Sequence, residues 1–141
     1  QGVVNLLESV QRQAAWFILN NYNRTGNVTQ MLQRLEWDSL ATRKLLNQCT
    51  MFFKIHHGLV NIPFPETVIP ATRQGRCTNS MSYQTIQSRV NSYKYSFFVR
   101  VIPVWNRLPT SVIQATTASQ FQSLTLPIVR DMAATPTHQL L

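Results

Sequence analysis

Three closely spaced prolines constrain the fold of this chain more than any other local feature. Pro63, Pro65 and Pro70 follow an amphipathic stretch, and a proline inside a helix removes a backbone hydrogen bond and collides with the preceding turn. Residues 58–80 are also rich in Gly, Thr and Asn, as connecting segments are. We therefore expect a helical half at residues 1–57, a connector at 58–92 and Trp-containing helices at 93–126.

The first part of the helical half shows the periodicity of two helices. Apolar residues recur three and four positions apart from about Val3 to Asn21, which predicts an amphipathic helix. Its inward face is expected to carry Val3, Leu7, Val10, Ala14 and either Phe17 or Ile18. Asn27 with Gln30 is typical of a capping box, and it predicts a short second helix that carries Met31, Leu32 and Leu35.

A third helix is predicted to start at Asp38 or Ser39, because either side chain can cap a first turn. One stripe of this helix is apolar and is expected to face the core: Leu45, Leu46, Cys49, Phe52, Phe53 and His56. The opposite stripe is polar and is expected to face solvent: Arg43, Asn47, Thr50 and Lys54. Gly58 follows the last periodic residue, where glycine commonly ends a helix.

The second half is less regular. The alternation of Met81, Tyr83 and Thr85 weakly favours a short strand, although ordered coil fits as well. A helix with Trp105 is expected to begin near Ile102, with Pro103 in its first turn, and to end at Pro109. Thr116 or Thr117 can cap a last helix, with Phe121 and Leu124 inward and Pro127 as its boundary; residues 127–141 are expected to form a flexible tail.

Together these patterns predict a mainly α fold of about five helices. The irregular stretch between residues 58 and 95 can include a short strand. A length of 141 residues and a hydrophobic fraction of 44% suffice for one domain with its own core, expected over residues 1–130. The core is expected to contain Trp37, Phe52, Phe98 and Trp105.

The charge of the chain favours an anionic partner. Thirteen Lys and Arg residues against five Asp and Glu residues give a net charge of +8, which favours nucleic acid or an anionic surface. The stretch from Thr67 through Arg130 contains seven basic residues and no acidic one. The first candidates for contact with an RNA or DNA backbone are Arg73, Arg76, Lys94, Arg100 and Arg107, followed by Arg43 and Lys54 on the third helix. For each of them a solvated surface cation is the alternative interpretation.

No catalytic or metal-ligating pattern is present. A metal-dependent polymerase or nuclease needs converging carboxylates, whereas Glu36 and Asp38 are the only close acidic pair and are interpreted as helix-start residues. Four glycines cannot build a phosphate-binding loop. His56 and His57 point about 100° apart on a helix and cannot readily hold one ion together. We expect no catalytic residue, metal, cofactor or small-molecule substrate.

The sequence also bears on cellular location. No stretch approaches the roughly 20 apolar residues of a membrane span, so no membrane partner is expected. Cys49 and Cys77 allow at most one disulfide, and two free thiols in a reducing compartment are the preferred interpretation. We expect an intracellular protein, nuclear or cytoplasmic. Because the chain begins with Gln1 rather than Met, we expect it to be a piece of a longer protein.

The segment from Tyr93 to Pro109 interleaves aromatic side chains with cations and ends in Trp-Asn-Arg-Leu-Pro. Three further blocks occur in a fixed order before it: residues 7–15, residues 22–37 and the Met-Phe-Phe-Lys-Ile-His-His-Gly-Leu-Val block at 51–60. Ser119, Gln120 and Phe121 follow it. In this order the blocks resemble the region C-terminal to the polymerase core in non-LTR (LINE-type) retrotransposon reverse transcriptases, especially jockey and CR1-like elements. One departure is Val99, where members of that family usually have proline.

The resemblance covers roughly residues 5–126. It implies that a polymerase core with metal-binding aspartates lies upstream, and that this chain is a thumb-proximal or post-thumb helical accessory region. Its implied role is to hold template, primer or target while the polymerase copies RNA into DNA, through cations on the sugar-phosphate backbone and aromatic side chains on unpaired bases. The alternative is a structural module that docks on the polymerase body through its apolar stripes.

Overall fold

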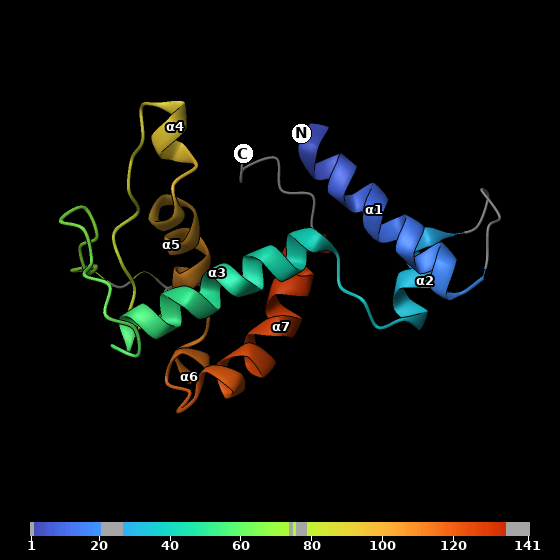
Figure 1. Cartoon of the computed structure of the whole chain (residues 1–141). Coiled ribbons are helices and arrows are strands. Elements are labelled where there is room, and N and C mark those ends of the chain that lie inside the picture. The colour runs from blue at the N-terminus through green and yellow to red at the C-terminus, as the bar shows by residue number, and fades with distance from the viewer. Residues whose placement is uncertain (1, 21–26, 74, 76–78, 135–141) are drawn as a thin grey trace. The chain divides into compact units, whose positions relative to one another are not determined.

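The computed structural model describes residues 2–20, 27–73, 75 and 79–134, and this part of the chain is mainly helical, which confirms the predicted fold class (Figure 1). The helices are α1 (Gly2–Ile18), α2 (Val28–Arg34), α3 (Leu40–His56), α4 (Asn91–Lys94), α5 (Phe97–Arg107), α6 (Thr110–Ile113) and α7 (Ala118–Ala134). The count exceeds the predicted five because α4 and α6 are single turns of four residues. None of the described helices is both long and apolar enough to cross a membrane.

The chain divides into two compact units. Unit 1 comprises Gln1–Lys44 and unit 2 comprises Leu45–Leu141. The boundary falls inside α3, whereas the sequence-based divisions lie at residues 57 and 92. The unit boundary therefore does not coincide with an end of the connector.

In unit 1, α1 uses polar side chains where the sequence predicts apolar ones. The Glu8 carboxylate accepts a hydrogen bond from the Leu40 backbone N–H at 3.2 Å, and the Gln11 side-chain amide donates to the Asp38 carbonyl at 3.0 Å. Among the α1 residues whose burial is described, Gln11 and Ala15 are buried and Ala14 is half-buried, whereas the other predicted inward residues, Val3, Leu7, Val10, Phe17 and Ile18, are exposed. Apart from the half-buried Ala14, the predicted inward face of α1 is wrong, because the side of α1 that packs within unit 1 binds backbone groups at the start of α3 through polar side chains.

In unit 2, α3 lies beside α5 and α7 (Figure 1), and aromatic side chains form contacts between these helices. The Phe52 ring lies 4.8 Å from Trp105 and 6.3 Å from Phe98, centroid to centroid, and the Phe53 ring stacks on Phe121 at 4.4 Å. Phe52 and Trp105 are fully buried, and the half-buried Phe98 packs against the same cluster. Trp37, which was also expected in the core, is half-buried in unit 1 and is not part of this cluster.

The C-terminal end of α3 is set by glycine, as the sequence predicts. Gly58 has a φ of +66°, in the left-handed region that side chains with a Cβ rarely adopt. The Leu59 N–H donates to the Lys54 carbonyl at 2.8 Å and the Gly58 N–H to the Ile55 carbonyl at 3.1 Å. These two bonds form a Schellman motif, which stops the helix and releases the chain into the connector.

The expected strand in the connector is reduced to one bridge between Pro70 and Tyr83 in the described residues. Backbone bonds from Ala71 to the Ser82 carbonyl and from Gln84 to the Ile69 carbonyl flank the bridge at 2.9 and 2.8 Å. On the other side of Tyr83, its N–H and carbonyl are bound by the Asn106 side chain at 2.9 and 2.7 Å. A side chain thus occupies the place of a second neighbouring strand, so the pairing does not extend.

Two prolines that the sequence predicts near helix ends lie inside helices instead. Helix α5 begins at Phe97 rather than near Ile102, so Pro103 is interior. Helix α7 is capped by Thr117, whose hydroxyl accepts from the Gln120 N–H at 3.1 Å, and it continues through Pro127 to Ala134. The predicted flexible tail from 127 is therefore wrong for residues 127–134, and residues 135–141 lie outside the described part of the chain.

Burial explains why both helices continue. A proline removes one backbone bond, to the carbonyl four residues earlier. In α7, Phe121, Thr125 and Val129 are fully buried at intervals of four residues, whereas Leu124, predicted inward, is 42% exposed. In α5, Val101, Ile102, Val104 and Trp105 are buried around Pro103. In both helices the buried face extends past the proline, and its burial outweighs the single missing bond.

Replacing Pro127 with alanine is expected to stabilise the chain. Pro127 is exposed, so the substitution removes no core contact, and it restores the bond to the Ser123 carbonyl in a helix interior where proline is about 3 kcal/mol less favourable than alanine. We expect the free energy of unfolding to rise by about 1–3 kcal/mol, measured by urea denaturation followed by circular dichroism. An unchanged or lowered stability would mean that α7 does not continue through this position.

Candidate nucleic-acid interface

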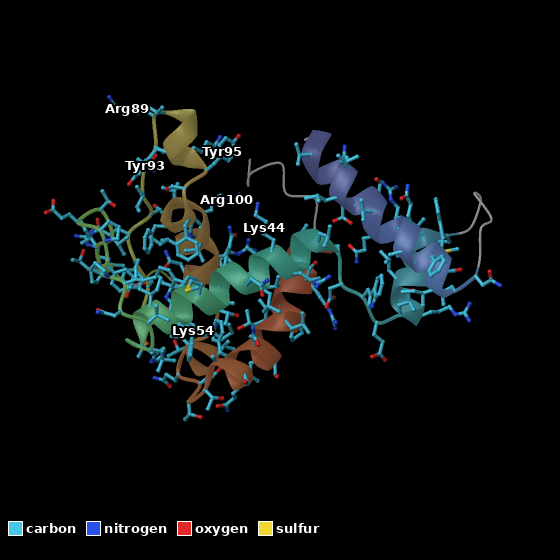
Figure 2. All side chains as sticks on the ribbon, in the orientation of Figure 1. Lys44, Lys54, Arg89, Tyr93, Tyr95 and Arg100 are labelled. Carbon is cyan, nitrogen blue, oxygen red and sulfur yellow. The ribbon has the colours of Figure 1, made fainter. Side chains whose placement is uncertain are left out.

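Five exposed side chains surround the junction of α4 and α5, and we refer to them as the α4–α5 patch: Arg89, Tyr93, Lys94, Tyr95 and Arg100. Tyr93 is 41% exposed and Tyr95 is 58% exposed, which is unusual for rings of this size. Figure 2 shows Tyr95 and Arg100 on one side of the junction, and Arg89 and Tyr93 on the other. The patch therefore presents cations and aromatic rings on both sides of a narrow projection.

The local backbone explains why these tyrosines face solvent. The N–H groups of Tyr93 and Lys94 donate to the Val90 carbonyl at 3.1 and 3.0 Å, which closes the single turn of α4. The Ser96 N–H then donates to the Tyr93 carbonyl at 2.9 Å, and α5 starts at Phe97. Phe97 and Phe98 pack against the core cluster. The turn thus separates the two phenylalanines, which pack inward, from the two tyrosines, whose hydroxyls tolerate water.

The electrostatic surroundings of the patch are uneven. No acidic residue occurs between Thr67 and Arg130. The Tyr93 hydroxyl donates to the Thr67 hydroxyl at 3.3 Å. Glu66 directly precedes Thr67 in the sequence, so this acidic residue belongs to the segment beside Tyr93. Tyr95 and Arg100 lie on the other side of the junction in Figure 2. The acidic residue nearest in sequence to Tyr93's partner thus adjoins the Tyr93 side of the junction, whereas Arg100 lies on the Tyr95 side.

Among the described cations of unit 2 that the sequence predicts to bind nucleic acid, Lys94 and Arg100 belong to this patch. Arg107 is exposed at the other end of α5, two helical turns or about 10 Å from Arg100 along the axis. Arg73 is exposed in the connector, and Arg76 lies outside the described residues. The described cations Arg73 and Arg107 therefore lie apart from the α4–α5 patch in the sequence and along α5.

The predicted polar stripe of α3 is only partly at the surface. Arg43 is exposed and belongs to unit 1, whereas Lys54 is half-buried and lies below α3 in Figure 2. Thr50 is 5% exposed, and its hydroxyl donates to the Leu46 carbonyl at 2.8 Å. The interpretation of Thr50 as a surface residue is wrong, because its hydroxyl is satisfied within the helix and its methyl group can be buried.

The sequence-based candidates omit three members of the patch: Arg89, Tyr93 and Tyr95. The signal that distinguishes them is the residue type within the aromatic run, because tyrosine carries a hydroxyl that favours partial exposure and phenylalanine does not. Arg89 lies in the acid-free stretch, next to Val90, which is 63% exposed. Arg89 lies close to α4 because of this short turn, which the sequence does not predict.

The Trp-Asn pair in the C-terminal half of α5 is structural. The Trp105 indole N–H donates to the Met81 carbonyl at 3.0 Å, and Asn106 binds both backbone groups of Tyr83. The Asn79 amide donates to the carbonyls of Trp105 and Leu108 at 2.8 and 3.1 Å, where α5 ends. These bonds hold residues 79–83 against α5, so Trp105 is unavailable for stacking on a base.

The described titratable groups Cys49, His56 and His57 are either desolvated or hydrogen-bonded to neighbouring segments. Burial raises the pKa of the Cys49 thiol to about 12, so this cysteine remains protonated at neutral pH. His56 Nδ1 lies 2.7 Å from the Tyr83 hydroxyl, and His57 Nε2 lies 2.9 Å from the Ile113 carbonyl. Each histidine therefore bonds to a different segment. Among the described residues, no group of three or more His, Cys, Asp and Glu side chains could hold a metal ion.

The stability of the chain is expected to depend on the protonation of His56. Desolvation, and secondarily the nearby His57, lower the pKa of His56 from 6.5 in the folded state. The unfolded chain therefore binds the proton first, so stability is full above pH 6.5 and is lost as the pH falls towards the lowered folded pKa. Unfolding free energies measured between about pH 7.5 and pH 5.5 should decrease, and His56→Gln should flatten this dependence. An equal slope in both proteins would contradict this assignment.

The side chains and their geometry are the basis for assigning a role, because no family model, no curated protein and no solved structure matches this chain.

Proposed function

We propose that this chain binds the sugar-phosphate backbone of RNA or DNA and has no catalytic activity of its own. The observation that carries the proposal is the α4–α5 patch, in which three exposed cations accompany two exposed tyrosine rings in a stretch without acidic residues. Cations that replace the counterions of phosphates provide affinity without reading sequence. The net charge of +8 acts in the same direction, by attracting a polyanion from a distance.

We further propose that the chain serves as an accessory region C-terminal to the polymerase core of a non-LTR retrotransposon reverse transcriptase inside the cell. The support is the ordered resemblance of its sequence blocks over roughly residues 5–126. In such a protein the polymerase core carries the metal-binding aspartates, and this chain contributes contacts to the nucleic acid beside it. A helical scaffold that presents cations on a rigid core suits that role.

Fluorescence anisotropy with the whole chain and labelled RNA or DNA tests the binding proposal. If the three patch cations contact phosphates, affinity for a single strand should fall about 20-fold between about 50 and 200 mM salt. The double variant Lys94→Ala/Arg100→Ala should weaken binding and reduce the salt dependence. Arg12→Ala/Arg34→Ala removes the same charge from exposed positions on α1 and α2 and should retain the dependence. Absent binding at low salt, or binding indifferent to salt, would refute the proposal.

A second candidate function is docking on another protein through α1. Val3, Leu6, Leu7, Val10, Phe17 and Ile18 are between 54% and 75% exposed. An exposed apolar stripe of this size is typical of interaction surfaces. If this function replaces nucleic-acid binding, charged substitutions such as Val10→Glu should abolish association with a polymerase partner, and the patch variants should leave it intact.

A further inference from the structure

We propose that the α4–α5 patch selects single-stranded over double-stranded nucleic acid, with Tyr95 as the main stacking platform and Tyr93 as the second. This inference rests on the proposed function and specifies the form of its ligand. Backbone cations alone do not require a single strand, because single strands and duplexes both present phosphates. The tyrosine rings add a requirement for bases whose faces are open.

The elements around the patch are unsuited to reading a duplex. A helix that enters the major groove needs a free face several residues long. Helix α4 has four residues, and α5 exposes only Arg100 and Arg107 among its eleven residues, since the others are buried or half-buried. The patch can therefore reach the phosphates of a duplex but offers no helix face to a groove. A flexible single strand, in contrast, can follow a narrow projection.

The two tyrosine rings differ in how accessible they are to a base, and this difference makes Tyr95 the main stacking platform. The Tyr93 hydroxyl is held by Thr67 at 3.3 Å, and the ring is 41% exposed. Tyr95 follows the last residue of α4, is 58% exposed and lies on the same side of the junction as Arg100 in Figure 2. A base stacked on Tyr95 would place its phosphate near a cation, and guanidinium groups also stack well on bases.

The neighbouring cations extend the path for a strand. Lys94 is exposed beside Tyr95 in sequence, and Arg89 is exposed at the start of the α4 segment. Arg107 lies two turns beyond Arg100 on nearly the same side of α5, about 10 Å along the axis. A strand that stacks on Tyr95 and follows α5 would therefore meet Arg100 first and Arg107 next.

Affinity measurements with the whole chain test this inference. The probes are labelled oligo(dT), oligo(U) and a blunt DNA duplex of equal length, at one low salt concentration. We expect both single strands to bind more tightly than the duplex. Tyr95→Ala should weaken single-strand binding by about 5- to 150-fold, the range expected for loss of one stacked base, and should leave duplex binding unchanged. Tyr95→Phe keeps the ring and should bind like the unmodified chain.

Two results would overturn the inference and leave the proposed function standing: salt-dependent binding that is equal or tighter for the duplex, or an unchanged single-strand affinity in Tyr95→Ala. Absent binding to every probe would instead refute the proposed function together with this inference. Tyr95 is 58% exposed and is not a member of the core cluster. Its variants should therefore fold, which circular dichroism checks before each titration.

Discussion

Replacing Trp105 with alanine is expected to lower the free energy of unfolding by about 3–5 kcal/mol, the range for removing a buried tryptophan. The indole is fully buried, with ring centroids 4.8 Å from Phe52, 5.2 Å from His56 and 6.1 Å from Phe121. The variant would leave a cavity where α3, α5 and α7 meet, and the Met81 carbonyl would lose its indole donor. Urea denaturation followed by circular dichroism measures the change.

Phe17→Ala provides the control for the Trp105 variant. Phe17 is an aromatic residue in a helix, but it is 75% exposed, so its removal should change stability by less than about 0.5 kcal/mol. If Trp105→Ala destabilised the chain by no more than this control does, the result would contradict the burial of Trp105 in the core of unit 2.

Asn106→Ala is expected to lower the free energy of unfolding by about 2–4 kcal/mol, because a buried backbone donor and a buried acceptor lose their partners together. The Asn106 amide accepts from the Tyr83 N–H at 2.9 Å and donates to the Tyr83 carbonyl at 2.7 Å. The loss should loosen residues 79–83, so amide hydrogen exchange should accelerate there more than in α7. Denaturation and hydrogen exchange together measure both effects.

Two variants sharpen the Asn106 prediction. Asn47→Ala removes the same amide from an exposed position on α3 and should be close to neutral. Asn106→Asp keeps the shape and can accept from the Tyr83 N–H but, when ionised, cannot donate to the carbonyl, so it should remain destabilising. If Asn106→Asp left the free energy of unfolding unchanged, the Asn106 amide would not bind both backbone groups of Tyr83.

The elements that the sequence predicts well are those in which local and long-range preferences agree. In α3 the apolar stripe with Cys49, Phe52 and Phe53 is buried, and Gly58 ends the helix through its left-handed backbone. Both features follow from residue type and spacing alone. The role of Trp105 as a packing residue is predictable for the same reason, because the largest apolar side chain of a short helix is seldom left in water.

The features that the sequence does not reveal depend on tertiary contacts. The inward face of α1 contains Gln11, whose side-chain amide donates to the Asp38 carbonyl, and no periodicity indicates such a partner. The start of α5 lies five residues before Ile102 because the burial of Val101 and Ile102 outweighs the bond lost at Pro103. Tertiary burial overrides a local helix-breaking preference in this case.

The sequence predicts that the candidate site is basic, but it does not predict which residues form it. The acid-free stretch identifies the basic region, and two of the seven predicted cations, Lys94 and Arg100, lie in the α4–α5 patch. The exposure of Tyr93 and Tyr95 depends on the single turn of α4, which turns the chain just before Phe97. A turn of four residues has too little periodicity to be recognised in a sequence.

Ultraviolet crosslinking of the chain to a single-stranded oligonucleotide tests the location of the interface most directly. Trypsin cleaves after Arg89, Lys94 and Arg100, so residues 90–94 and 95–100 form two short peptides with one tyrosine each. We predict that mass spectrometry will find the crosslinked nucleotide on these peptides, more on 95–100 than on 90–94, and that Tyr95→Ala will remove the major product. Crosslinks confined to α1, α2 or α7, with both tyrosine peptides unmodified, would contradict the assignment of the α4–α5 patch as the nucleic-acid interface.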